Sequence, residues 1–152
     1  MNFFTEETSD IEGYRKNLKS LQGKLDKQTS AFMLQDSFHD GMPLEIKICN
    51  PFEQTEYEEI ADSIVDINMK IRHWNETAYE LYWTNVMRYT MDFDISRNSI
   101  VGTDEVLHYR RLDEWGYDEL TLSTNGKLHH EIQLFSGTTI IIECSQFHIK
   151  KL

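Results

Sequence analysis

The sequence has little proline, glycine and cysteine. Two prolines and seven glycines among 152 residues argue against a fibrous or disordered chain. The two cysteines, Cys49 and Cys144, are too few for a disulfide framework. Both lie in apolar runs typical of strands, so we expect two buried free thiols. Neither a CxxC motif nor a basic neighbourhood indicates a redox site.

Long apolar runs and basic clusters are also missing. No run approaches the roughly 20 apolar residues that span a bilayer. The first residues have neither the basic start nor the apolar core of a secretory signal, so we expect a cytoplasmic location. The 26 acidic and 15 basic residues give a formal net charge of −11. This charge disfavours binding to nucleic acids and anionic membranes, and it would attract a basic protein partner.

Motifs of common enzymes are absent as well. The sequence contains no P-loop, GxGxxG, GxSxG or HExxH. The acidic segment from Glu53 to Asp62 lacks the glycine and the Asp/Asn alternation of an EF-hand. A solvated helix face explains that segment best, and a docking surface for a basic partner is the alternative. We therefore expect no cofactor, no metal and no catalytic residue, and we favour a non-catalytic role.

The strongest pattern present is an alternation of apolar and polar residues between Tyr79 and Ile95. Such a period of two buries one face of a strand and leaves the other in water. The stretch is too long for one ordinary strand. It predicts two strands or one bent strand, with the break near Asn85.

Further strands are predicted on both sides of this stretch. Asn125-Gly126 between two alternating runs is a strong hairpin signal. A change in the spacing of the apolar residues predicts a bulge near Ser145 in the last strand. We leave the irregular section 96–116 open between a short helix and an irregular strand. The predicted strands are Leu44 to Cys49, ended by Asn50-Pro51, then Val65 to Arg72, Leu120 to Leu122, Leu128 to Leu134, and Thr139 to Ile149.

An amphipathic helix is predicted between Thr5 and Thr29, followed by a connection from Ala31 to Asp40. Ser9 or Thr8 would cap its start, with Glu12 completing a capping box after Ser9. The apolar stripe of this helix is Ile11, Tyr14, Leu18, Leu21 and Leu25. The predicted fold is therefore α+β. It consists of this N-terminal amphipathic helix and a mainly antiparallel β meander of six to eight strands, as a curved sheet or partial barrel, in a single domain over residues 1–152.

Histidines beside carboxylates are the first candidates for chemistry. His39-Asp40 lies in the connection, and His129-His130-Glu131 lies on a predicted strand. A histidine and a carboxylate can bind a metal or act as acid and base. However, neighbouring residues on a strand point to opposite faces. His130 packed among apolar residues is therefore favoured, and a ligand site formed by His130, Glu131 and His148 is the alternative.

Aromatic residues on polar faces are candidates for an interface. Trp74 and Tyr82 fall on the polar faces of their strands, while Trp115 and Tyr117 lie in the irregular section. Exposed aromatic side chains often anchor protein interfaces. The alternative is a sheet with both faces covered.

The C-terminal half carries a hydrophobic spacing that resembles small uncharacterised bacterial domains of Firmicute type, some of which resemble immunity proteins of toxin systems. This resemblance implies no catalytic residues, and it makes the neutralisation of a basic toxin a hypothesis for an acidic domain. The spacing consists of Trp115-x-Tyr117-x-Glu119-Leu120, His130-Glu131-Ile132, Gly137, Ile140-x-Ile142 and Phe147-x-Ile149, after an entry through His39-Asp40.

Three functional hypotheses follow. The first is a protein-binding domain, with a role in toxin immunity as its specific form. The second is a small-molecule-binding or hydrolytic domain whose site lies in the mouth of a curved sheet. The third is a homodimer formed through sheet edges or exposed aromatics.

Overall fold

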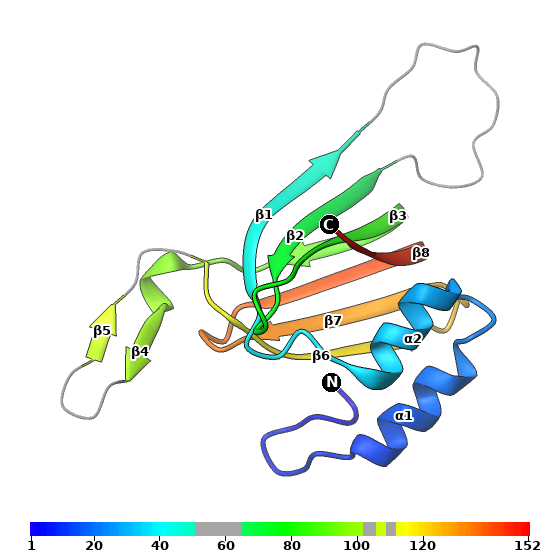
Figure 1. Ribbon diagram of the computed structural model, residues 1–152, viewed down its shortest axis with the longest axis horizontal. Coiled ribbons are helices and arrows are strands. Elements are labelled where there is room, and N and C mark those ends of the chain that lie inside the picture. The colour runs from blue at the N-terminus through cyan, green and yellow to red at the C-terminus, as the bar shows by residue number, and fades with distance from the viewer. Residues whose placement is uncertain (51–64, 102–105, 109–111) are drawn as a thin grey trace.

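The computed structural model (Figure 1) describes residues 1–50, 65–101, 106–108 and 112–152. Two helices, α1 (Ile11–Ser20) and α2 (Lys27–Gln35), pack beside a six-stranded antiparallel sheet. In Figure 1 they lie next to strands β6, β7 and β8. Within the described part of the chain, no helix is long and apolar enough to cross a membrane.

The sheet has the spatial order β1-β2-β3-β8-β7-β6, and all neighbouring strands are antiparallel. Its end strands, β1 and β6, are not paired with each other, so the sheet is open. The predicted α+β class with an antiparallel sheet is confirmed. The strands are β1 (Met42–Cys49), β2 (Asp66–Arg72), β3 (Ala78–Met91), β6 (Trp115–Leu122), β7 (Leu128–Leu134) and β8 (Thr139–Lys151).

The strand order corrects the predicted simple meander. Strands β1–β3 and β6–β8 form two separate meanders, which are joined through the pairing of β3 with β8. Between them lie a short 3-10 helix, η1 (Ile95–Arg97), and a hairpin of β4 (Ser99–Val101) and β5 (Val106–His108). This hairpin stands apart from the main sheet (Figure 1). An alternating pattern identifies a strand but not its partner, which is why the central pairing was not predicted.

Strand β3 is continuous but irregular where the break was predicted. Asn85 has a left-handed backbone conformation, with φ of 52°. The register against β8 shifts between Val86 and Arg88. As a result Val86 is buried in place of Asn85, and Met87 is exposed.

Strand β8 shows the predicted change in spacing, with Cys144 and Phe147 both buried on either side of Ser145. The shift in register lies in the partner strand β3, so the predicted bulge was assigned to the wrong strand of the pair. Cys144 is a buried free thiol, as predicted, whereas the free thiol of Cys49 is only partly buried.

The N-terminal helix is shorter than predicted, and a second helix follows it. Helix α1 begins after Asp10, whose carboxylate accepts the N–H of Gly13, so the cap predicted at Thr8 or Ser9 was wrong. Helix α2 begins after Asp26, which accepts the N–H of Thr29. It extends into the first half of the segment predicted as a connection.

The hairpin turn predicted at Asn125-Gly126 is confirmed, and a second turn contains Gly137. Gly126 adopts φ of 78° between β6 and β7, and Gly137 adopts φ of 81° between β7 and β8. Both conformations favour glycine. Strands β2 and β3 also form a hairpin. The acidic segment from Glu53 to Asp62 lies outside the described residues.

Helix α2 takes the place of a neighbouring strand along the last part of β8. Strand β7 follows β8 only as far as the pair Leu128 and Cys144. Beyond this point, Ile149 donates its backbone N–H to the hydroxyl of Thr29 over 2.9 Å. The helix therefore covers a sheet edge that would otherwise remain open.

Candidate functional site

A chain of hydrogen bonds runs through the core and ends near the surface. Trp83 donates its indole N–H to Nδ1 of His130 over 3.1 Å. An indole nitrogen can only donate, so Nδ1 carries no proton and the neutral ring carries its proton on Nε2. Nε2 in turn donates to Asp118 over 3.1 Å, and Trp115 donates to the other Asp118 oxygen over 3.0 Å. Every member has a partner, so the chain fixes the core geometry.

A cleft of about 470 Å³ opens where this chain ends. It lies between α1, the end of α2 and the start of β6. Its wall includes the carboxylate of Asp118 and the side chain of Tyr14, whose hydroxyl accepts the backbone N–H of Leu120. Burial, together with the negative charge of Asp118, raises the pKa of Tyr14 well above its ordinary value. The hydroxyl is therefore protonated at neutral pH and links helix α1 to strand β6.

The lining of the cleft is more apolar than polar. Asp36 and Asp118 are the acidic residues that line the cleft, and Arg15 is a basic one. His39 also lines it. Asp36 is already engaged, because it accepts from Nε2 of the buried His73 over 3.2 Å. The apolar lining consists of Phe4, Ile11, Leu18, Met33 and Leu34.

Four rings gather at the mouth of this cleft, and we call them the aromatic cluster: Phe4, His39, Tyr117 and Phe135. The His39 ring lies 5.3 Å from that of Tyr117 and 5.5 Å from that of Phe135. Phe4 stacks on Tyr117 at 5.7 Å. Tyr117 is 46% exposed and Phe135 is 52% exposed. Phe4 and His39 are half-buried. A contiguous group of rings that is partly exposed is uncommon on a surface that contacts only water.

A glycine allows the cluster to form. The register of β6 against β7 shifts between Trp115 and Tyr117, which makes Gly116 the bulge residue. A Cβ atom on Gly116 would lie 2.9 Å from the carbonyl oxygen of Gln133. His39 also contacts the carbonyl oxygen of Gly116 through Nδ1. The bulge thereby directs Tyr117 outward, as bulges do next to binding sites.

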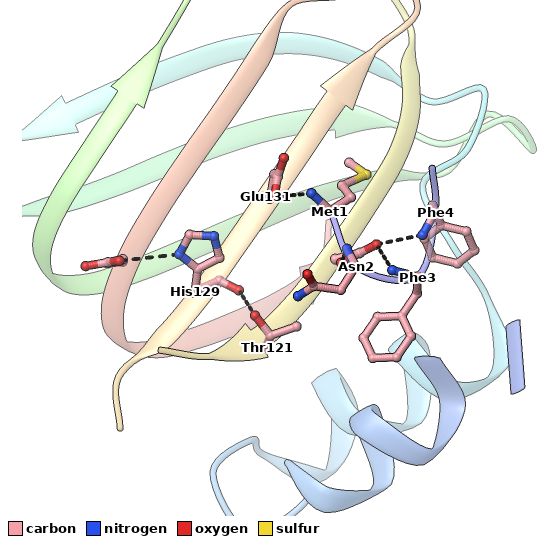
Figure 2. Close-up of polar contacts among 9 residues, drawn as sticks. Met1, Asn2, Phe3, Phe4, Thr121, His129 and Glu131 are labelled. Atoms are coloured by element: carbon pink, nitrogen blue, oxygen red, sulfur yellow. Dashed lines mark hydrogen bonds and ion pairs between the residues drawn. The ribbon is translucent and has the colours of Figure 1, made fainter. Parts of the chain in front are cut away.

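The first four residues form a strap that holds one ring of the cluster in place (Figure 2). The carboxylate of Glu119 accepts the backbone N–H groups of Asn2, Phe3 and Phe4 over 2.6, 2.6 and 2.7 Å. The amino group of Met1 pairs with Glu131 over 2.8 Å. Glu119 is only 2% exposed, so this carboxylate is fully committed to the strap. Charge-assisted hydrogen bonds of this kind are among the stronger ones in proteins.

A second hollow, of about 380 Å³, lies on the other side of the Phe4–Tyr117 stack. Glu6 and Glu7 line it together with Gln133. The carboxylates beside the aromatic cluster are therefore Asp36 in the first cleft, which also contains Arg15, and the two glutamates in the second. Such a surface favours a partner that carries positive charge.

The structure places the three residues of the predicted ligand site in different surroundings. His130 is buried in the hydrogen-bonded chain described above. Glu131 lies on the opposite face of the sheet and binds the amino group of Met1. His148 pairs with Asp26 over 2.8 Å at the start of α2. The packing of His130 in the core, favoured from the sequence, is observed, and the three side chains do not converge.

The four aromatics predicted as an interface differ in exposure. Trp74 and Tyr117 are exposed, and Tyr82 is half-buried with its hydroxyl bonded to Glu80. Trp115 is fully buried, so its assignment to an exposed interface was wrong. The error arose because Trp115 lies at the start of β6, where the alternation was too short to define a buried face.

Sequence reasoning missed three residues of this region. No sequence pattern indicated that Phe4 belongs to this region, because its position depends on the hydrogen bonds of the strap to Glu119. Phe135 follows Leu134 at the end of a strand and was overlooked beside the turn that comes next. In the sequence, Asp118 is distinguished from the other acidic residues only by its position three residues after Trp115. In a segment whose secondary structure was not predicted, that spacing does not indicate a contact between the two side chains.

The hydrogen-bonded chain engages the two titratable side chains nearest the cleft wall. His130 and Asp118 bond to each other and to two indoles, so neither is poised at an accessible reacting atom. Among the described residues, no three His, Cys, Asp or Glu side chains are grouped to hold a metal ion. No protein-family model and no curated protein sequence matches the chain. Function must therefore be argued from the geometry.

Proposed function

We propose that the chain is a non-catalytic protein-binding domain that holds a basic partner at the aromatic cluster. The observation that supports this is the group of exposed rings around Tyr117 and Phe135, with a hollow on each side that contains carboxylates. Aromatic rings supply contact area at low entropic cost, and the surrounding acids select the charge of the partner. The net charge of −11 acts in the same direction over longer distances.

Toxin immunity is the specific form of this proposal. A basic enzyme that acts on nucleic acid exposes lysines and arginines at its active site, and an acidic surface with protruding rings would cover them. The resemblance of the C-terminal hydrophobic spacing to immunity-type domains supports this choice. The proposal includes a cytoplasmic location.

Affinity capture with matched variants tests the proposal. The immobilised wild-type chain should retain a basic protein, and added salt should weaken that binding because exposed charges are screened. The double variant Tyr117→Ala/Phe135→Ala should lose at least about tenfold in affinity, since each central ring contributes on the order of 1–2 kcal/mol. Trp74→Ala, which removes an exposed ring outside the cluster, serves as the control. Equal retention by the double variant would refute the proposed surface.

A second candidate function is the binding of a small molecule in the 470 Å³ cleft. This volume lies within the range of ligand pockets, and its lining joins apolar walls to a few polar groups. Native mass spectrometry of the purified chain would show a bound small molecule as an additional mass. Loss of that mass in Arg15→Ala or Leu18→Phe, with the aromatic cluster intact, would favour this function over protein binding.

A further inference from the structure

Strand β1 is an open edge of the sheet, and the backbone pairing shows which of its groups point outward. In the β2–β3 hairpin His73 donates its N–H to Thr77, so His73 bonds towards β3. The direction of bonding alternates along an antiparallel strand. Asn68 and Lys70 therefore bond towards β1, where the register places them opposite Lys47 and Glu45.

It follows that Ile46 and Ile48 direct their N–H and C=O groups away from β2. Among the described residues no backbone group accepts or donates to them. The same alternation applied to β8 directs the N–H of Ile149 away from β3, where it meets Thr29 as described above. This agreement supports the assignment of the outward groups.

The side chains along this edge are arranged symmetrically about Ile46. Apolar residues lie two positions away on each side, and residues of opposite charge lie one position away. Leu44 is 54% exposed and Ile48 is 48% exposed. Between them lie Glu45 and Lys47, on the face of the strand opposite to Ile46. When two copies of such a strand pair antiparallel about Ile46, Glu45 meets Lys47 of the second copy, and Leu44 meets Ile48.

We propose that β1 pairs with β1 of a second copy of this chain, with Ile46 opposite Ile46 across a two-fold axis. The outward N–H and C=O groups of Ile46 then bond to each other. Ile48 lies opposite Leu44 of the second copy, the residue at which the register of β1 against β2 shifts. Glu45, which pairs with Lys47 and Lys70 of its own chain, then also faces Lys47 of the second copy, once on each side of the axis. A two-fold interface uses the same patch on both copies, so assembly stops at the dimer.

The other edge of the sheet explains why β1 pairs with itself. On β6, the N–H and C=O of Leu120 are taken by the Tyr14 hydroxyl and the Asn17 amide. At its start, Trp115 donates to Gly41 and accepts from Asp40. An incoming β1 strand would have to displace these partners, whereas a second β1 meets an open edge.

A mixing experiment on charge variants tests the dimer. An interface of one strand pair is small, so we expect self-association at concentrations between about 1 µM and about 1 mM. Analytical ultracentrifugation of the full chain should show a mass that rises from one chain to two over this range. Lys47→Glu makes the edge purely acidic and Glu45→Lys makes it purely basic, so each variant should dimerise at least about tenfold more weakly.

An equimolar mixture of the two variants should recover the mass of two chains, because acidic and basic edges then face each other. This recovery also shows that both variants are folded. A mass of one chain for the wild type at all concentrations would overturn the proposal, as would dimers of both variants with wild-type affinity. Tyr117→Ala/Phe135→Ala should dimerise like the wild type, so the outcome is independent of the proposed partner-binding surface.

Discussion

Trp83 and His130 share a buried hydrogen bond of 3.1 Å that fixes the imidazole as a neutral ring with its proton on Nε2. Because Nε2 then donates to Asp118, one bond sets the direction of the next. The histidine that looked like a candidate ligand in the sequence is thus a connector between two core tryptophans and the wall of the cleft.

Trp83→Phe should destabilise the protein while preserving an aromatic ring in the core. Without the indole N–H, Nδ1 of His130 is buried and unsatisfied, which costs about 1–3 kcal/mol. Urea unfolding followed by circular dichroism measures this difference. Trp74→Phe, on an exposed turn, should change the free energy of unfolding by less than about 0.5 kcal/mol. Equal effects of the two variants would contradict the role assigned to the bond.

Glu119→Gln should release the strap. A neutral amide offers one acceptor and adds a donor opposite three backbone N–H groups, so we expect a loss of about 2 kcal/mol or more in unfolding free energy. Hydrogen exchange should show lost protection at the amides of Phe3 and Phe4. Glu6→Gln, an exposed change in the same segment, is the matched control. Unchanged protection in Glu119→Gln would show that the strap is held by its rings alone.

Asp26 should make stability depend on pH in the acid range. Partial burial raises its pKa, but the N–H and hydroxyl of Thr29 and the ring of His148 outweigh this and lower it from 3.8 to about 2. A lowered carboxyl pKa in the folded state contributes stability that is present above about pH 4 and is lost as the pH falls towards 2. Because Asp26 is partly exposed, we expect about 1 kcal/mol.

Asp26→Asn is the variant that checks this pH dependence. Asparagine also caps helices well, so α2 should form, and the variant should be less stable than the wild type at pH 7. The difference should shrink between pH 4 and pH 2 in urea titrations. A constant difference over that range would assign the effect to capping and not to charge.

The two thiols should differ in reactivity. Burial raises the pKa of Cys144 to about 12, although the backbone N–H of Gln146 and the charge of Lys127 lower it in part. A thiol reagent at pH 8 should therefore modify one cysteine, the partly buried Cys49, in the folded protein and both in denaturant. Cys49→Ser should abolish the reaction of the folded protein. Rapid modification of two thiols without denaturant would contradict the burial of Cys144.

The sequence determined the strands better than their arrangement. Alternation placed β2, β3, β7 and β8 correctly, because one buried face leaves a period of two. Helix α2 was not predicted, because its apolar residues do not form a clear stripe on one face. The feature that marks its start in the sequence is the capping residue Asp26. The pairing of β3 with β8 is non-local and left no mark in either strand.

The candidate site was predictable only in fragments. Tyr117 and His39 were noted separately as an aromatic and as a histidine in a loop. Their 5.3 Å contact depends on the Gly116 bulge and on the path of the chain from α2 to β1. Phe4 joins them through the Glu119 carboxylate. Contacts of this kind arise from tertiary structure, so patterns within one segment cannot reveal them.

The pairing of β3 with β8 also affects when the sheet can fold during synthesis. A ribosome delivers β1, β2 and β3 well before β8, so the first meander must wait with the long edge of β3 unpaired. Trp83 and Leu81 of β3 lie opposite Phe147 and Ile149 of β8, and all four side chains are buried in the folded protein. Folding of the whole sheet is therefore expected to follow synthesis rather than accompany it, and to be slow for a chain of this length. During that interval the unpaired edge of β3 is open to pairing with strands of other chains.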